Sequence, residues 1–210
     1  MDKITSKLSF KTITSEEETS QFLDKIEDQT DVKLPTEYAN NSKIVGVFLQ
    51  NELVGGYMLV TKPYFRSLLF VPDKIKIQHP FFKNDEYEMM EVNGLWLGAA
   101  IKTPKLQYRF WMHLVKDIFL AKKKYLLLMS DSKNKNIEYI HNLTKPEIFY
   151  QGAPDLMAGD KSHSSIRVGF TTRWSLVLNA PKYFLELKSR QSRVKKGAKQ
   201  RAFNRAIKQD

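Results

Sequence analysis

The junction near residue 102 combines residue types that could bind a phosphate. An apolar run ends before Lys102, and Thr103-Pro104 suits the cap and first turn of a helix. Lys105 and Arg109 follow in the first two turns. A helix N-terminus presents unpaired N–H groups, and nearby cations add charges that attract an anion. The alternative is that these cations are simply exposed residues at the start of a core helix.

Glu91 is a second candidate, because it lies in the largely apolar stretch from Glu86 to Leu97. A carboxylate in such a strand is partly removed from water, which makes it a better proton acceptor for general-base chemistry. The alternative is a glutamate that faces solvent while its neighbour Met90 faces the core.

Several other kinds of chemistry are excluded. The chain has no cysteine, so it has no disulfide, thiolate metal site or cysteine nucleophile. Its four histidines lack the carboxylate spacing of a metal site, and we expect no metal. No nucleophile elbow, Walker loop or dinucleotide fingerprint is present. No stretch approaches 18 apolar residues, so we predict a cytoplasmic protein without a membrane span.

The first half of the chain predicts a strand, a helix and a hairpin. Alternating residues from Lys7 to Ile13 indicate a half-buried strand, and Ser15 with Glu18 forms a capping box for the next helix. Two apolar runs flank Gln50-Asn51-Glu52, which is typical of a β-hairpin. The segments 31–43 and 62–85 read as irregular.

The second half predicts a crossover unit. A strand from Glu86 to Leu97 contains Asn93-Gly94, which we interpret as a bulge. A helix from Pro104 leads to a buried strand at Tyr125–Met129, which should be parallel to the preceding one. A short helix at 137–143 and strands at 148–151 and 166–178 complete an α/β fold with a mixed sheet.

Four segments together resemble the GNAT (Gcn5-related N-acetyltransferase) family, over roughly Leu8 to Asn179. They are the first strand with its acidic capped helix, the hairpin VGVFLQNELVGGYML, the strand and helix EVNGLWLGAAIKTPKLQYRFWMHL, and YLLLMSDSKNKNIEYIHN. The resemblance implies a mixed, mostly antiparallel sheet with a central βαβ unit and helices on both faces. It also implies an N-acyltransferase that moves an acyl group from a pantetheine thioester to an amine.

The resemblance also implies roles for particular residues. Glu91 would be the general base and Tyr139 the general acid that protonates the departing thiolate. The residues implied to bind the donor, acyl-CoA or acyl-phosphopantetheine, are Leu95, Trp96, Leu97, Lys102, Lys105, Gln107, Arg109, Asn134 and Asn136.

The phosphate loop departs from the family pattern Arg/Gln-x-x-Gly-x-Gly/Ala. Here the stretch from Lys102 to Gln107 reads KTPKLQ, without either glycine, and Pro104 removes one N–H group. The stretch is similar to that of some relatives that handle long acyl chains, which also lack a well-formed glycine loop and take acyl groups from acyl carrier protein. Acyl carrier protein is acidic and bears a single phosphate on its pantetheine, and the resemblance implies that the acyl group could be a long chain. The donor is therefore acyl-CoA or an acyl carrier protein, and the acceptor an amine of an amino acid, peptide or small metabolite.

Most of the positive charge lies at the C-terminus. The range 182–210 holds ten Lys or Arg residues against Glu186 and Asp210, a formal +8 of the chain's +11. We divide the chain into an acyltransferase domain, 1–181, and a basic helical tail, 182–210. Such a tail could bind nucleic acid or an acidic protein, or remain solvated without a specific partner. A non-catalytic GNAT-derived module that recruits partners through this tail is the alternative function.

Aromatic and aliphatic residues also gather in the irregular middle segment. They either line a long acyl pocket or cap the sheet, and they are Phe65, Leu68, Leu69, Phe70, Phe81 and Phe82.

Overall fold

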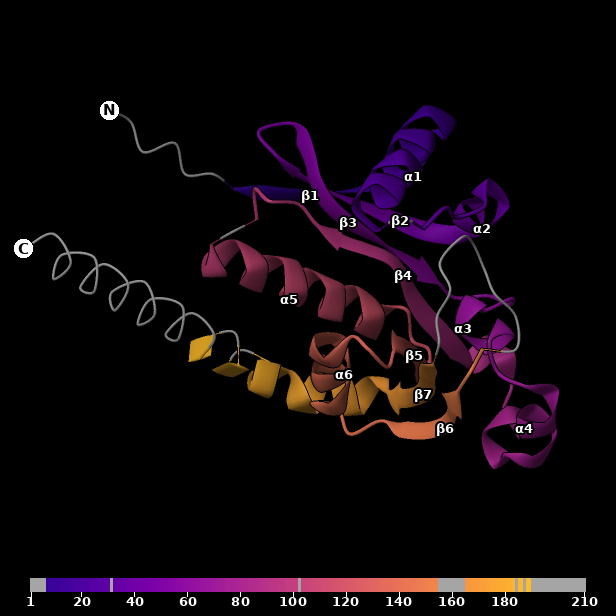
Figure 1. The fold of residues 1–210 in the computed structure, drawn as a ribbon. Helices are drawn as coiled ribbons and strands as arrows, with labels where there is room; N and C mark the ends of the chain where they lie inside the picture. Colours follow the sequence, from indigo (N-terminus) through magenta and orange to yellow (C-terminus); the bar gives the residue numbers. More distant parts are fainter. Residues whose placement is uncertain are drawn as a thin grey trace, which may run out of the picture.

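The computed structural model describes residues 7–30, 32–101, 103–154, 165–183, 185–186 and 188–189. Seven strands within these ranges form one sheet in the order β1-β2-β3-β4-β5-β7-β6 (Figure 1). The strands are β1 (Leu8–Ile13), β2 (Ser42–Leu49), β3 (Glu52–Val60), β4 (Met89–Leu97), β5 (Tyr125–Asp131), β6 (Glu147–Gly152) and β7 (Ile166–Thr172). Neighbouring strands are antiparallel except β4 and β5, which are parallel. The predicted mixed, mostly antiparallel sheet is confirmed.

The parallel pair is joined by α5 (Pro104–Leu120), which makes the predicted central βαβ unit. Thr103 caps this helix, since its Oγ1 accepts a hydrogen bond from the Leu106 N–H at 3.4 Å. Pro104 occupies the first turn, where its missing N–H costs nothing. The same residues that ended the apolar run therefore begin the helix.

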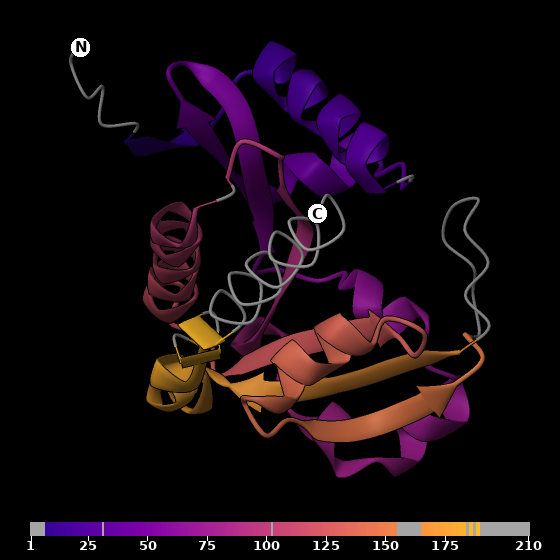
Figure 2. The same ribbon diagram turned by 60° about the vertical axis from the view of Figure 1, so that its left-hand side comes forward.

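Helices cover both faces of the sheet, as predicted (Figures 1 and 2). Phe22 of the first helix packs in one cluster with Ile44, whereas Phe110 of α5 packs in another with Val45. Adjacent residues of β2 point to opposite faces, so these two helices lie on opposite sides. The helices on the first side are α1 (Glu16–Thr30), α2 (Thr36–Asn40), α3 (Arg66–Leu69) and α4 (Asp73–Gln78), followed by the 3₁₀ turns η1 (Pro80–Lys83) and η2 (Glu86–Glu88). The second side carries α5, α6 (Lys135–Asn142) and a helix over 173–183.

The predicted hairpin joins β2 to β3 through a two-residue loop. Gln50 and Asn51 have φ angles of 52° and 68°. Two positive φ angles define the tight turn whose twist matches that of the flanking strands.

The predicted bulge is present in β4. Asn93 pairs with Met58 and Trp96 pairs with Gly56, so two residues of β4 face one residue of β3. Gly94 lies at the bulge with a φ of +53°, a conformation that side chains rarely adopt. The bulge bends β4 at the point where a site could open.

Two parts of the secondary structure differ from the prediction. The segments expected to be irregular contain the short helices α2, α3 and α4, which were too brief to show periodicity. The last predicted strand continued to Leu178, but a helix begins at 173. Thr172 accepts a hydrogen bond from the Ser175 N–H at 3.0 Å, which starts this helix. Trp174 and Leu178 are exposed on one side of it, so the apolar run did not mark a buried strand.

Candidate active site

A cleft opens where β4 and β5 stop pairing. The parallel register joins Met89–Glu91 to Tyr125–Leu127. Beyond it, β4 continues to Leu97 and β5 to Asp131 without further pairing between them in the described residues. Diverging strands leave backbone N–H and C=O groups along their facing edges, where an extended ligand can bond to them.

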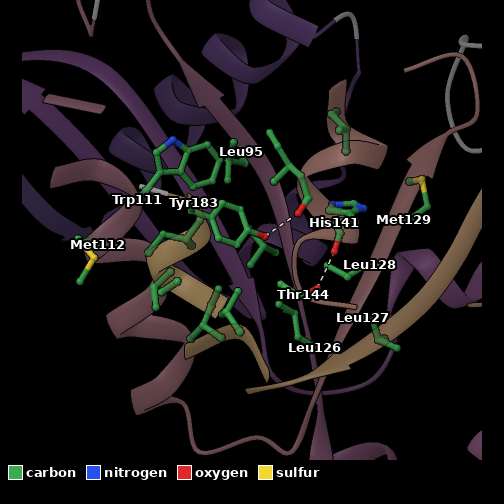
Figure 3. Close-up of a pocket in the computed structure, with 18 residues that line it drawn as sticks. Leu95, Trp111, Met112, Leu126, Leu127, Leu128, Met129, His141, Thr144 and Tyr183 are labelled. Carbon is green, nitrogen blue, oxygen red and sulfur yellow. Dashed lines mark hydrogen bonds between the residues drawn. The ribbon is translucent and has the colours of Figure 1, made fainter. Parts of the chain in front are cut away.

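An apolar pocket of about 260 Å³ lies in this opening. Its walls are the diverging strands, α5, α6 and the helix over 173–183 (Figure 3). Leu95 of β4 and Leu128 of β5 lie on the strand side, and Trp111 of α5 closes another side. None of the described residues that line it carries a carboxylate, ammonium or guanidinium group.

The polar groups of the pocket are already paired or neutral. Tyr183 donates its hydroxyl hydrogen to the carbonyl of Ile140 at 2.9 Å, and Thr144 donates to the carbonyl of His141 at 2.7 Å (Figure 3). Burial, helped by the nearby Arg167, lowers the pKa of His141 to about 4. Burial raises the pKa of Tyr183 to about 12. The described lining of the pocket therefore carries no charge at neutral pH.

Glu91 is the last residue of β4 that pairs with β5. Its side chain lies on the opposite face of the sheet from that of Val92. Its carboxylate is 2% exposed. Oε1 accepts the Arg66 N–H at 2.8 Å, and Oε2 accepts the Ser67 N–H at 3.0 Å and the Ser67 hydroxyl at 2.6 Å. Because these two N–H groups open α3, the carboxylate also caps that helix.

Two further donors reach Glu91 from its own side of the sheet. The Tyr38 hydroxyl donates to Oε1, and the Asn93 amide donates to Oε1 at 3.0 Å and to the Tyr38 oxygen at 2.7 Å. Burial and the carboxylate raise the pKa of Tyr38, so this phenol stays protonated. Tyr38 is only partly buried, whereas Glu91 is almost fully buried.

The strand-to-helix junction offers fewer anion-binding groups than its sequence suggested. The Leu106 N–H is bonded to Thr103, and the Gln107 amide donates to the carbonyl of Ile101 at 3.2 Å. The side chains of Lys105 and Arg109 make no ion pair with any described residue, and Lys105 is exposed. Lys102 lies outside the described residues.

No protein-family model matches the sequence, and no curated protein matches it. The structure, however, resembles solved GNAT structures. FeeM, an N-acyl amino acid synthase from uncultured soil microbes, matches with a TM-score of 0.55 and 9% identity over 80% of this chain and 92% of that one. A GNAT family acetyltransferase from Elizabethkingia anophelis with acetyl-CoA bound matches at 0.53 and 10% identity over 79% and 97%. A GCN5-related N-acetyltransferase from Brucella melitensis matches at 0.53 and 6% identity over 86% and 82%.

The chain has the GNAT fold. The splayed strands, the bulge and the crossover helix are its central features here. The low identities leave the residues of the site to be judged on their own geometry. In the described part of the chain, no helix is long and apolar enough to cross a membrane, and no cluster of three metal-binding side chains occurs.

Not every predicted residue of the GNAT site reaches the pocket. Tyr139 lies on α6 with its side chain 44% exposed, and its hydroxyl donates to Glu186 at 3.2 Å instead of lining the pocket. Asn134 caps α6 by accepting the Ile137 N–H at 3.2 Å. Asn136 lies in the same helix, and its side chain is outside the described part. The roles of these residues stay predictions.

The backbone segment predicted to hold the donor follows the bulge. Leu95 lines the pocket, whereas the Trp96 side chain is buried on the α1 face and Leu97 packs near α5. The Trp96 indole N–H is buried without a hydrogen-bond partner among the described residues. Only the side chain of Leu95 therefore faces the pocket, and Trp96 and Leu97 could contribute backbone groups alone.

Sequence reasoning missed the fourth wall of the pocket. Leu176, Ala180 and Tyr183 line it from the helix over 173–183, part of which was read as a strand. The residues suggested for an acyl pocket instead cap the sheet: Phe81 stacks on Phe170 with ring centroids 4.1 Å apart, in a cluster that holds Phe65 and Phe70. The missed signal was the spacing of residues 176, 180 and 183, which places them on one helical face.

Proposed function

We propose that this chain is an N-acyltransferase that moves an acyl group from a pantetheine thioester to an amine of an amino acid, peptide or small metabolite. The observation that carries the proposal is the opening between β4 and β5, which begins two residues before Gly94 of the bulge and leads into a pocket whose described lining is uncharged. A thioester arm extended along the unpaired edge of β4 would place its carbonyl beside the bulge.

In this reaction the amine nitrogen attacks the thioester carbonyl and forms a C–N bond. The tetrahedral intermediate collapses with cleavage of the C–S bond, giving an amide and a thiolate. The nitrogen loses one proton, and the thiolate gains one. Backbone N–H groups of Leu95 to Leu97 are suited to hold the carbonyl oxygen as it becomes negative.

Glu91 is the proposed final acceptor of the amine proton. The acceptor amine cannot touch its carboxylate directly, because Glu91 is almost fully buried behind Tyr38. The Tyr38 oxygen would take the amine proton while its own hydroxyl proton passes to Glu91. Tyr139 stays the predicted donor to the thiolate, and Tyr183, whose protonated hydroxyl lies at the pocket, is the alternative.

A carrier-protein donor is favoured over CoA by the junction at α5. Pro104 has no N–H, and the Leu106 N–H is already bonded, which leaves little of a pyrophosphate cradle. Lys105 and Arg109 can still neutralise one phosphate. The basic tail adds attraction for an acidic carrier surface.

Donor binding tests this proposal. Native mass spectrometry of the full chain, incubated with acyl-CoA and acyl carrier protein carrying acyl groups from acetyl to palmitoyl, is expected to show a one-to-one complex. Absence of any such complex would overturn the proposal.

The non-catalytic alternative has one observation in its favour. The carboxylate of Glu91 is surrounded by donors, as expected of a residue that holds α3 in place. Under that alternative, the basic tail would bind nucleic acid, and the affinity would fall steeply with salt. A salt titration with duplex DNA separates the two functions.

A further inference from the structure

The helix over 173–183 has two faces with different surroundings. Leu176, Ala180 and Tyr183 face the pocket, and Leu176 is 5% exposed. Trp174 and Leu178 are 55% and 76% exposed. Figure 2 shows this helix beside α5, on the same side of the sheet as α6. It is therefore a wall of the pocket, and not an appendage that merely follows the last strand.

The wall is held by contacts with α6 and the turn that follows it. Tyr183 bonds to the carbonyl of Ile140, and the Ser175 hydroxyl donates to the carbonyl of Thr144 at 2.6 Å. Tyr139 of α6 reaches Glu186, further along the chain. These contacts, at successive points along the chain, fix the spacing between the helix and α6, so the pocket has a defined shape.

The chemistry of the pocket selects an uncharged, apolar ligand. A charged group would lose its hydration without gaining a counter-ion from any lining residue that the structure describes. Methylene groups, by contrast, gain about 0.8 kcal/mol each when they leave water. Val92 and Leu95 of β4 are among the lining residues, so the pocket adjoins the opening between β4 and β5.

We propose that this pocket binds the acyl chain of the thioester donor, and that the helix over 173–183 sets the chain length. The proposal rests on the proposed function, since it places the acyl carbonyl beside the bulge. The pocket volume of about 260 Å³ far exceeds the ~10–15 Å³ of such volume that one water needs, so it has room for several methylene groups. The donor class is thus an acyl thioester with a chain longer than acetyl, and octanoyl is the chain used to probe it.

The expected dependence on chain length is steep. A gain of about 0.8 kcal/mol for each buried methylene is roughly a fourfold gain in affinity. Octanoyl-CoA should bind more than about a hundredfold more tightly than acetyl-CoA. The gain should stop once the chain exceeds the pocket.

The test is calorimetric titration of the full chain with acetyl-CoA, octanoyl-CoA and octanoyl-pantetheine, which has no phosphate. Ala180→Phe fills the pocket and is expected to weaken the binding of octanoyl-CoA at least tenfold, and to weaken that of acetyl-CoA much less. Leu178→Phe is the matched control, because it adds the same ring on the exposed side of the same helix. It is expected to leave both affinities within twofold of the wild type.

Leu176→Ala is a second variant, with the opposite effect on the volume of the pocket. It enlarges the pocket, so the preferred chain should lengthen towards dodecanoyl. This shift keeps the proposal testable if Ala180→Phe does not fold, as judged by circular dichroism.

The outcomes separate this inference from the proposed function. Equal affinity for acetyl-CoA and octanoyl-CoA, or no effect of either pocket variant, overturns the acyl-chain pocket but leaves an acyltransferase. Tight binding of octanoyl-pantetheine without transfer to any amine supports the pocket and contradicts the proposed function. Failure of all three probes to bind overturns the acyl-chain pocket, whereas the acyltransferase is overturned only if acyl carrier protein does not bind either.

Discussion

At the scale of single residues, Glu91 and Tyr38 are the pair on which the proposed proton transfer depends. A hydrogen bond joins them, and Asn93 bonds to both. Groups that act in the same proton-transfer path should not contribute independently to the rate.

Glu91→Gln and Tyr38→Phe are each expected to lower kcat by about 10² or more, with little change in the KM for the donor. The double variant should be no slower than the worse single variant, because either change breaks the same proton path. Steady-state assays of the three proteins measure this. Multiplicative losses in the double variant, or wild-type turnover in either single variant, would contradict the relay.

Because Glu91 also anchors α3, these variants need a structural control. Ser67→Ala removes one donor to the carboxylate and leaves Tyr38 in place. It should cost about 1 kcal/mol of stability with a nearly unchanged rate. A rate loss in this control equal to that of Glu91→Gln would show that the effect is structural.

His141 gives a prediction about pH. Its pKa is about 4 in the folded protein, against about 6.5 when unfolded. The unfolded state therefore binds more protons between these values, so stability rises with pH across this window and is lost as pH falls from about 6.5 towards 4. The full effect is about 3 kcal/mol.

Urea unfolding at pH 7 and pH 4.5, for the wild type and His141→Asn, measures this contribution. The variant should lose less stability than the wild type between the two pH values. An identical loss in both proteins would show that other groups cause the acid sensitivity.

At the scale of elements, the bulge in β4 positions the site. Gly94 has a φ of +53°, and a Cβ there would lie 2.5 Å from Cδ1 of Ile26 on α1. Gly94→Ala should therefore lower the free energy of unfolding by about 1 to 3 kcal/mol and reduce donor affinity.

Adding Ile26→Val to Gly94→Ala separates the two causes. The smaller side chain relieves the contact but not the backbone conformation, so recovery should be partial. Denaturant unfolding measures both variants against Ile26→Val alone. Full recovery would mean that the φ angle carries no strain, and an unchanged stability in Gly94→Ala would contradict the assignment of the bulge.

The elements also show what could be read from the sequence. The Asn-Gly pair within one apolar run predicted the bulge, and Thr103-Pro104 predicted the start of α5, because both depend on local backbone chemistry. The segment 173–178 was misread because its apolar residues suit either a strand or a helix, and only the cap from Thr172 decides between them. The role of Glu91 as an anchor for α3 depends on contacts between residues 24 and 25 positions apart, which no local pattern reveals.

At the scale of the whole molecule, the division at residue 181 stays a prediction, and contacts across it decide where a truncation can be made. Tyr183 and Glu186 already contact α6, so a cut at 182 would remove part of the pocket wall. A cut after Ser189 keeps these contacts and still removes eight of the ten basic residues beyond 181.

The chain ending at Ser189 is expected to unfold at nearly the same temperature as the full chain. Its affinity for an acidic acyl carrier protein should fall at least tenfold at low salt, and less at high salt, because screening weakens charge attraction. Its affinity for octanoyl-CoA should not change. A truncated chain that unfolds would instead make the tail part of the fold.

Turnover tests the central claim most directly. The full chain would be mixed with octanoyl-CoA or octanoyl carrier protein and a mixture of amino acids, amines and short peptides, with thiol release and product masses followed together. We expect thiol to be released in equal amount to a new amide, whose mass is that of one acceptor with one hydrogen replaced by the octanoyl group, and far less product from acetyl donors. Donor binding without any amide product would contradict an acyltransferase and favour the binding module.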